Sequence, residues 1–414
     1  MTSILIRPFQ AVHPPAGDAI RVASVPYDVI TRSEASIIAT ENEDSFIRVI
    51  RSEVDFPEDV SPYDPKIYTR ARENYDRLLQ KGMLEKDTKS SVYLYRQCIG
   101  DRYQVGIVAC CHVDDYNKHR IRKHEKTREV KENDRTNHVL GMHANTGPVF
   151  LTYRGHPDID SIIEDEMITR PMFHFVASDG VTHTGWRIDD ETALLAAFAH
   201  VDTAYVADGH HRIASAARAA KVLQESNPNH DGSEEYNRFL AVLFPASQLH
   251  ILPYNRTVSD LHGHSPEAFL AALKNAGTLV STNDPTLLSA GSFCMYMGKE
   301  HGGWFRLDLD PQSIDTNDPI ASLDVELLQQ RVLSPILGIG DPRSDTRIDF
   351  VGGIHGSVAL EHHVDNGNAA VAFSLCATTI DQLLTVADAQ LIMPPKSTWF
   401  EPKLCSGLFV HELN

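Results

Sequence analysis

The sequence predicts an α/β protein of the α+β kind, built on a mixed sheet. Short apolar runs at 147–153, 204–207 and 239–244 indicate buried strands. Apolar residues from Ile213 onward recur at helical spacing. A cluster of Asn, Asp, Gly and Ser at 227–233 indicates a turn between such elements. Strands and helices therefore alternate along the chain, which is typical of layered α/β architectures.

The first 115 residues are expected to form an α/β region of their own. Strands are predicted at 4–7 and 46–50, a helix at 70–79 that Gly82 ends, and a hairpin of 92–98 with 104–111 across Gly100-Asp101. The segment Val25-Pro-Tyr-Asp-Val29 is expected to be a turn with Tyr27 packed inward, because Pro26 prevents a regular helix. These elements suggest a fold but no chemistry.

Residues 116–135 form a charged segment, with eight Lys or Arg and four carboxylates and almost no apolar stripe. We expect a polar helix on a surface or beside a charged ligand. Further along, a helix is predicted at 192–200, a helix capped by Ser265 and Pro266, and a helix whose capping box is Thr379 with Gln382. Strands are expected at 293–297 and 305–309.

Composition restricts the class of protein. The 414 residues are 42% hydrophobic and carry a net charge of −18, which disfavours nucleic acid and anionic membranes as partners. The six cysteines form no CxxC pair, as expected for reduced thiols of a cytoplasmic protein. Arg7 and Pro8 interrupt the first apolar run, and no later run approaches a membrane-spanning length. We therefore expect a cytoplasmic protein with no membrane or nucleic-acid partner.

The stretch that carries most chemistry is the predicted turn from strand to helix at 208–212. It contains Asp208, Gly209, His210, His211 and Arg212. The first amides of a helix lack intrahelical partners and the helix dipole favours negative charge, so such a turn is suited to a phosphate. Arg212 would add a bidentate cation. The alternative is an ordinary turn in which Asp208 is the N-cap and the histidines are solvated.

A second polar segment follows two prolines near the end of the sequence. Pro394 and Pro395 hold the backbone extended, so that Lys396, Ser397 and Thr398 are presented from a stiff arm. These side chains suit a phosphate contact, although the GxxxxGK pattern of a Walker A loop is absent. The alternative is a plain extended arm anchored by Trp399 and Phe400.

Three segments, taken in order, resemble those of a known family. They are Arg122-Lys-His-Glu-Lys-Thr127, Val206-Ala-Asp-Gly-His-His-Arg212 and Met393-Pro-Pro-Lys-Ser-Thr398. The chain resembles the SerK-type free serine kinases of the ParB/sulfiredoxin-like superfamily over about residues 116–414. It also resembles, over its whole length, a bacterial family of unknown function that shares Pro26-Tyr27-Asp28 and a PPKSTWFEPK ending. The resemblance implies a ParB/sulfiredoxin-like core at 116–414 and an additional N-terminal α/β region at 1–115.

The resemblance also implies an activity. The chain would be a phosphotransferase that moves a phosphoryl group from ATP or ADP, with Mg²⁺, to the hydroxyl of free serine or a related hydroxy amino acid. By position, Glu125 and Asp208 would be catalytic, with Asp208 also near the metal ion. The nucleotide phosphates would be held by Gly209, His210, His211, Arg212, Lys396, Ser397 and Thr398. The acceptor would be contacted by Lys123, His124 and Thr127.

One departure from the kinases affects the acceptor more than the reaction. Where they continue the last segment with basic residues, this chain has Trp399 and Phe400. Two other classes stay open: a ParB-like regulatory protein that binds nucleotide without turnover, and a metal-dependent hydrolase using some of the 21 histidines. Against the hydrolase, the sequence has no HExxH spacing. The acceptor, the phosphate donor and the oligomeric state are not specified by the sequence.

Overall fold

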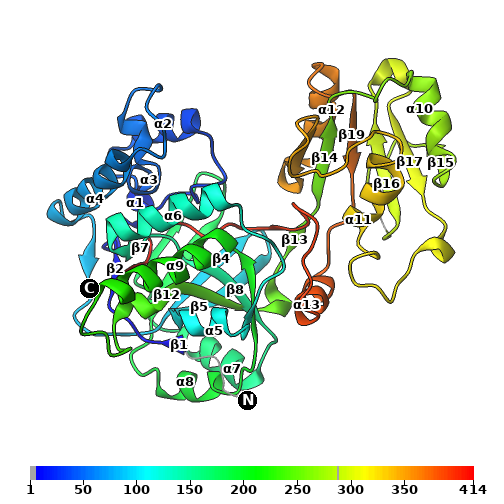
Figure 1. Cartoon of the computed structure of the whole chain (residues 1–414). Coiled ribbons are helices and arrows are strands. Elements are labelled where there is room, and N and C mark those ends of the chain that lie inside the picture. Colours follow the sequence, from blue (N-terminus) through cyan, green and yellow to red (C-terminus); the bar gives the residue numbers. More distant parts are fainter. Residues whose placement is uncertain (1–5, 287–288) are drawn as a thin grey trace. The chain divides into compact units, whose positions relative to one another are not determined.

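The computed structural model describes residues 6–286 and 289–414, which divide into two compact units (Figure 1). The first unit runs to Leu249 and also includes Pro402–Asn414. The second unit is His250–Glu401. The first unit is therefore discontinuous in sequence. The boundary expected between residues 115 and 116 lies within the first unit and stays a prediction about family resemblance.

Among the described residues, a nine-stranded mixed sheet forms the centre of the first unit. Its order is β6 (Ile121–Arg122), β11 (Ala204–Asp208), β8 (Val149–Tyr153), β12 (Arg238–Pro245), β5 (Arg102–His112), β4 (Tyr93–Ile99), β10 (Thr182–Arg187) and β9 (Phe173–Val176), with β1 (Ile6–Arg7) also on β5. The pairs β11–β6 and β12–β8 are parallel and the others antiparallel. Every residue of β12 is buried, which fits a central strand covered on both faces.

Helices cover this sheet. The long helices α6 (Glu129–Met142) and α9 (His210–Ser226) pack side by side, as Figure 1 shows. Helices α7 (Pro157–Glu166) and α8 (Thr192–Phe198) pack together, and α5 (Val113–Asn117) contacts α9. The core between these elements includes Ile107, Val206 and Leu243 from strands and Phe198 and Ile213 from helices. Burial of this apolar surface is the main force that holds α9 against the sheet.

Residues 19–80 add four helices with a second core. These are α1 (Ala19–Val22), α2 (Arg32–Glu41), α3 (Ile47–Ile50) and α4 (Pro65–Gln80). Their apolar side chains, such as Phe46 and Tyr75, pack with Met142 of α6 and Val410. A small sheet of β3 (Glu85–Lys86), β2 (Ala11–His13), β21 (Val410–Glu412) and β7 (Ala144–Asn145) joins the two ends of the chain. The N-terminal helices are thus part of the first unit.

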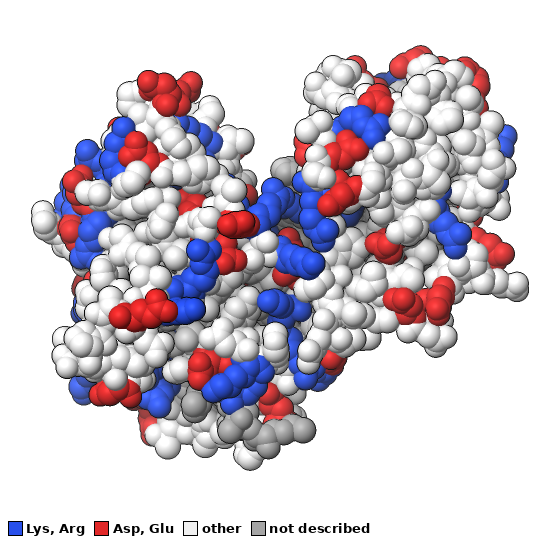
Figure 2. All heavy atoms as spheres, in the orientation of Figure 1, with Lys and Arg blue, Asp and Glu red and all other residues white. Residues whose placement is uncertain are grey.

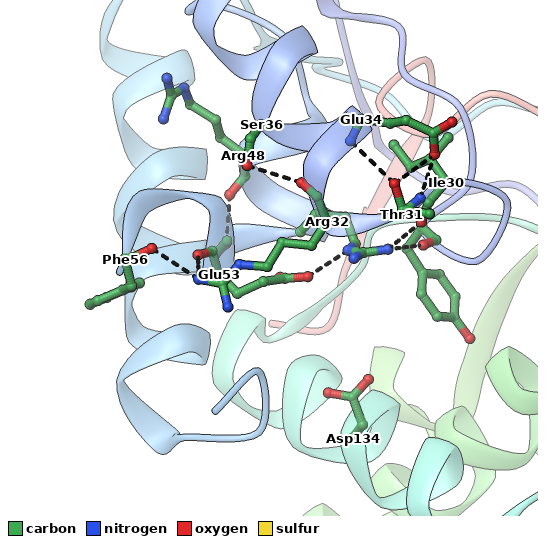
Figure 3. Close-up of polar contacts among 12 residues, drawn as sticks. Ile30, Thr31, Arg32, Glu34, Ser36, Arg48, Glu53, Phe56 and Asp134 are labelled. Carbon is green, nitrogen blue, oxygen red and sulfur yellow. Dashed lines mark hydrogen bonds and ion pairs between the residues drawn. The ribbon is translucent and has the colours of Figure 1, made fainter. Parts of the chain in front are cut away.

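The start of α2 shows how this region is held (Figure 3). Thr31 and Glu34 form a capping box, in which each side chain accepts from the other residue's amide. Arg32 donates to backbone carbonyls of the following loop, including those of Glu53 and Phe56, both at 2.9 Å. One guanidinium therefore ties several backbone carbonyls between residues 53 and 60 to the start of α2.

The second unit contains a six-stranded antiparallel sheet in its described residues. Its order is β15 (Thr278–Ser281), β17 (Trp304–Asp308), β16 (Ser292–Tyr296), β19 (Val371–Ser374), β14 (Tyr254–Val258) and β18 (Ile348–Gly352). Its helices are α10 (Pro266–Leu273), α11 (Asp324–Leu328), α12 (Gly356–Asp365) and α13 (Ile380–Asp388). Helix α11 continues as a π-helical turn, Gln329–Leu333. Cys294, Leu360 and Ala372 belong to a core separate from those of the first unit.

The predicted mixed α/β fold is confirmed. The hairpin of β4 and β5, the cap of α10 at Ser265 and the capping box of α13 are also confirmed. The strand predicted at 46–50 is wrong, because this short buried run forms α3. The single polar helix expected within 116–135 is also wrong: the segment holds the end of α5, strand β6, a loop and the start of α6. Part of strand 4–7 lies outside the described residues.

Charged groups are mixed over the surface. Acidic and basic side chains are interspersed on the visible face of each unit (Figure 2). In the described part of the chain, no helix combines the length and the apolar character needed to cross a membrane.

Candidate functional site

The turn between β11 and α9 is the centre of the candidate site. Its helix begins at His210, earlier than the start expected near Arg212, and its N-cap is Gly209 rather than Asp208. Gly209 has φ of 90°, a left-handed conformation, and a Cβ there would lie 2.8 Å from Nε of Arg212. Glycine at this position thus allows both the sharp turn and the folding of Arg212 back over it. The first amides of α9 point out of the helix end.

Asp208 is held by cations and an amide. Its Oδ2 is 3.0 Å from Nζ of Lys403, and its Oδ1 accepts from the amide of Gly209 at 2.7 Å and lies 3.8 Å from Arg212. Burial opposes the charged form, but Lys403 and Arg212 outweigh it and hold the pKa of Asp208 well below its ordinary value. The carboxylate is therefore ionised and fixes two cations beside the turn.

Arg212 is largely buried behind the turn. It donates to the carbonyl of Pro148, and its Nε is buried with no hydrogen-bond partner among the described residues. Arg212 lines a cavity of about 40 Å³ with Tyr27 and Arg135. The guanidinium of Arg135 lies over the Tyr27 ring, 4.2 Å from its centre. The N-terminal region therefore supplies part of the wall behind Arg212, and Tyr27 packs inward as predicted.

Glu125 reaches the same turn from another part of the sheet. Its Oε2 lies 4.0 Å from Nδ1 of His210, the first residue of α9. The ring of His210 packs edge-on against that of His124, with centres 4.5 Å apart. Because β6 pairs in parallel with β11, the residues that follow the two strands emerge at the same edge of the sheet. The sequence-predicted juxtaposition of residue 125 with the 208–212 turn is thus present in the structure.

Both of these histidines are neutral. Burial lowers the pKa of His124 to about 3 and that of His210 to about 3. Nε2 of His210 is buried without a hydrogen-bond partner in the part of the chain that the structure describes. At neutral pH His210 can therefore donate or accept a hydrogen bond, but it adds no positive charge.

His211 connects the N-termini of α9 and α6. Its Nε2 accepts from the amide of Arg128, the N-cap residue of α6, at 3.0 Å. This bond fixes the tautomer with its proton on Nδ1. Burial also lowers the pKa of His211. The two helix N-termini are thereby held next to each other.

Lys123 and Thr127 lie in the loop between β6 and α6. The loop, rather than the start of a helix, also carries Glu125, contrary to expectation. Nζ of Lys123 lies 5.3 Å from the centre of the Tyr116 ring, and the Thr127 hydroxyl donates to Glu132 at 2.7 Å. Both residues line an open pocket of about 790 Å³ along the exposed side of α9. Their contact with an acceptor stays a prediction.

Lys396, Ser397 and Thr398 belong to the second unit. Lys396 has φ of 57° in a turn at residues 395–396, so the extended backbone expected after the two prolines is wrong at this point. Its Nζ lies 5.1 Å from the centre of the Tyr254 ring. The Ser397 hydroxyl is buried and donates to the carbonyl of Pro394 at 2.7 Å. The arm continues as β20 (Trp399–Phe400), which pairs with β13 (Ile251–Leu252), so its anchoring by these aromatic residues is confirmed. The predicted contact of these residues with the nucleotide stays a prediction.

Lys403 was not predicted as a site residue. It lies 195 positions after Asp208, and its backbone carbonyl is held by the Gln97 amide at 2.7 Å. The one signal was its place in the PPKSTWFEPK ending, which the sequence resemblance singled out as a whole. No spacing rule connects it to residue 208.

The side chains around Asp208 offer few ligands for a metal ion. Within residues 6–286 and 289–414, no group of three or more His, Cys, Asp or Glu side chains is arranged to hold a metal ion. Asp208 offers one carboxylate, and Lys403 occupies one of its oxygens. Because magnesium is often bound through one or two carboxylates and substrate phosphates, Asp208 as its ligand stays a prediction.

The fold is that of a mixed α/β protein in which a strand-to-helix turn carries the candidate site. The chain belongs to the family described as protein of unknown function (DUF1015), whose model matches residues 6–326. No curated protein sequence matches it. Similar solved structures include a free serine kinase in complex with AMP, with 12% identity, a TM-score of 0.34, and coverage of 71% of this chain and 86% of that one.

Two further solved structures are similar. One is SbnI with a C-terminal truncation from Staphylococcus aureus, with 12% identity, a TM-score of 0.40, and coverage of 73% of this chain and 87% of that one. The other is a conserved hypothetical protein from Pyrococcus furiosus, with 13% identity, a TM-score of 0.35, and coverage of 73% and 95%.

Proposed function

We propose that this chain is a small-molecule kinase. It would transfer a phosphoryl group from ATP or ADP to the hydroxyl of free serine or a related hydroxy amino acid. The observation that carries the proposal is the approach of Glu125 to the first residue of α9, with 4.0 Å between Oε2 and Nδ1 of His210. A carboxylate beside a helix N-terminus combines the two groups that phosphoryl transfer requires, a base and a phosphate site.

The phosphate end of the proposed site is the start of α9. Its outward amides favour an anion, and Arg212 and Lys403, both ordered by Asp208, supply positive charge. His210 would add a neutral N–H donor. Such preorganised donors stabilise phosphate oxygens without rearranging during the reaction.

The acceptor end is the loop that carries Glu125. This carboxylate is partly exposed, with 38% of its side chain accessible, so an incoming hydroxyl can reach it. It would accept the hydroxyl proton while the oxygen attacks the terminal phosphorus in line. Lys123, in the same loop, would attract the acceptor's carboxylate. Mg²⁺, when bound with the nucleotide, would neutralise charge on its phosphates.

The test is Glu125→Gln. The variant keeps the size of the side chain but cannot take a proton, so turnover should fall by about 10²-fold or more while nucleotide affinity stays nearly unchanged. Turnover is measured as phosphorylated product from a panel of hydroxy amino acids with ATP and with ADP. Binding is measured by calorimetry.

The matched control is Glu129→Gln, which makes the same change at an exposed position of the first turn of α6. It should leave turnover unchanged. Arg212→Ala should instead weaken nucleotide binding. Full activity in Glu125→Gln, or bound nucleotide with no product from any acceptor, would contradict the proposal.

A further inference from the structure

The second unit contains a pocket that the proposed kinase reaction does not use. It has a volume of about 340 Å³ and lies entirely within His250–Glu401. Strands β14 and β18, the π-helical turn and the Pro394-Pro395 arm form its walls. Its volume lies within the range of small-molecule sites.

A buried cation forms part of the pocket wall. Arg256 is only 3% exposed and stacks on Phe350, whose ring centre is 5.3 Å from the guanidinium. Its protein partners are carbonyls: that of Tyr254, and those of Pro395 and Lys396 at 3.3 and 3.0 Å. Among the described residues no carboxylate forms an ion pair with it. Burial accordingly lowers the pKa of Arg256 to about 9.

An isolated buried charge is costly, and breaking one half of a buried ion pair is strongly destabilising. Carbonyl dipoles compensate Arg256 in part, but a carboxylate in the pocket would supply the missing negative charge. The fork of the guanidinium matches a carboxylate geometrically. Arg256 therefore indicates a ligand with an anionic group.

The other lining residues narrow the chemical class of the ligand. Glu326 lines the pocket and accepts from Gln330, and Asp341 lines it 3.8 Å from Arg343. Nε2 of Gln329 donates to the carbonyls of Ile339 and Gly340, which leaves its own side-chain oxygen as an acceptor. Acidic groups and an amide oxygen next to a buried cation are suited to a zwitterionic ligand, which carries one positive and one negative group.

We propose that this pocket binds a free amino acid. Its carboxylate pairs with Arg256, and its ammonium group faces Glu326 and Asp341. Arg343 also lines the pocket and offsets the charge of Asp341, so Glu326 is the carboxylate that repels a phosphate dianion, whereas a zwitterion is attracted at both ends. The π-helical turn supports a ligand role, because such turns occur frequently at functional sites. The inference concerns binding alone and stands whether or not the chain is a kinase.

The experiment is titration of the full chain, without nucleotide, with glycine, alanine, serine and leucine, and separately with inorganic phosphate. Calorimetry should show saturable binding of at least one amino acid and none of phosphate at the same concentration. Glu326→Gln should weaken amino-acid affinity by about 5-fold or more, and Arg256→Lys, which keeps the charge but loses the fork, by about 10-fold or more. Circular dichroism checks that both variants are folded.

Two controls match these changes at sites outside the pocket. Glu300→Gln and Arg306→Lys alter exposed side chains of the same unit and should leave binding unchanged. Glu125→Gln should also retain binding of glycine, alanine and leucine, which lack the hydroxyl of the proposed acceptors, so this inference and the proposed reaction can fail separately. Amino-acid binding that Glu326→Gln and Arg256→Lys do not change, or phosphate binding in preference to amino acids, would overturn the inference.

Discussion

At the scale of single residues, burial decides which groups of the site are charged. The sequence places three side chains at 210–212 that can carry positive charge or donate hydrogen bonds, and burial lowers the pKa of both histidines. The positive charge comes instead from Arg212 and from Lys403, which lies far away in the chain. The residues of the turn could be identified as site candidates from the sequence. The ionisation states of their side chains could not be predicted, because these depend on packing by distant segments.

Burial has the opposite effect on a carboxyl group of the second unit. Asp324 is 8% exposed, and burial raises its pKa to about 6, although the amide of Gly291 donates to it at 2.8 Å. Since the folded pKa exceeds the unfolded value, this group favours folding below pH 4, and the stabilisation is lost as pH rises through 6. Above pH 7 the ionised form costs up to about 3 kcal/mol.

Asp324→Asn should therefore stabilise the protein at pH 8, by up to about 3 kcal/mol, and have little effect near pH 4. Asparagine keeps an acceptor for the Gly291 amide and carries no charge. Urea unfolding at a series of pH values gives the free energy of unfolding. The control is Asp349→Asn at an exposed position of β18, which should show no such dependence. An equal effect of Asp324→Asn at both pH values would disprove the assignment.

At the scale of elements, the strand-to-helix turn was predicted well and its neighbours less so. The run 204–207 and the spacing from Ile213 located β11 and α9, because residues 204–207 are all buried and α9 buries one face at helical spacing. The 116–135 segment was misassigned because β6 consists of two residues whose partner is β11. Such a short strand is formed by pairing across the sheet, and local sequence carries little trace of it.

The turn itself should be sensitive to a single methyl group. In Gly209→Ala the new Cβ would combine a left-handed φ with a clash against Arg212, so we expect a loss of about 2 kcal/mol or more and weaker nucleotide binding. Gly82→Ala is the matched control, since Gly82 has φ of 71° but no atom near its Cβ position. It should cost about 1 kcal/mol and leave binding unchanged. Thermal unfolding measures the loss of stability and calorimetry the nucleotide affinity. Equal changes in both variants would show that the contact between residue 209 and Arg212 is not responsible.

At the scale of the whole molecule, the sequence predicted the fold class but not the division of the chain. The first unit takes its last strand and Lys403 from residues beyond the second unit. A boundary of this kind leaves no compositional change to detect, because Leu249 and Pro402 lie in segments of ordinary globular composition. The return of the chain is shown by long-range contacts, namely the pairing of β21 with β2 and β7 and the ion pair of Lys403 with Asp208.

The two units have separate cores, so they should unfold in separate steps. Leu360→Ala truncates a fully buried side chain of the second unit and should lower one calorimetric transition, by a destabilisation of about 2–5 kcal/mol. Leu243→Ala makes the matched change in the first unit and should lower the other. A single transition that both variants shift alike would show that the units unfold together.

The return of the chain has a consequence for biosynthesis. Asp208 leaves the ribosome long before Lys403, with all of residues 250–401 between them. Until residues 403–412 emerge, the nascent β11–α9 turn holds its carboxylate without that ammonium group, and β2 and β7 lack their pairing with β21. Folding of the first unit during translation is therefore completed only after residues 250–401 have been synthesised, which delays assembly of the candidate site around Asp208 until then.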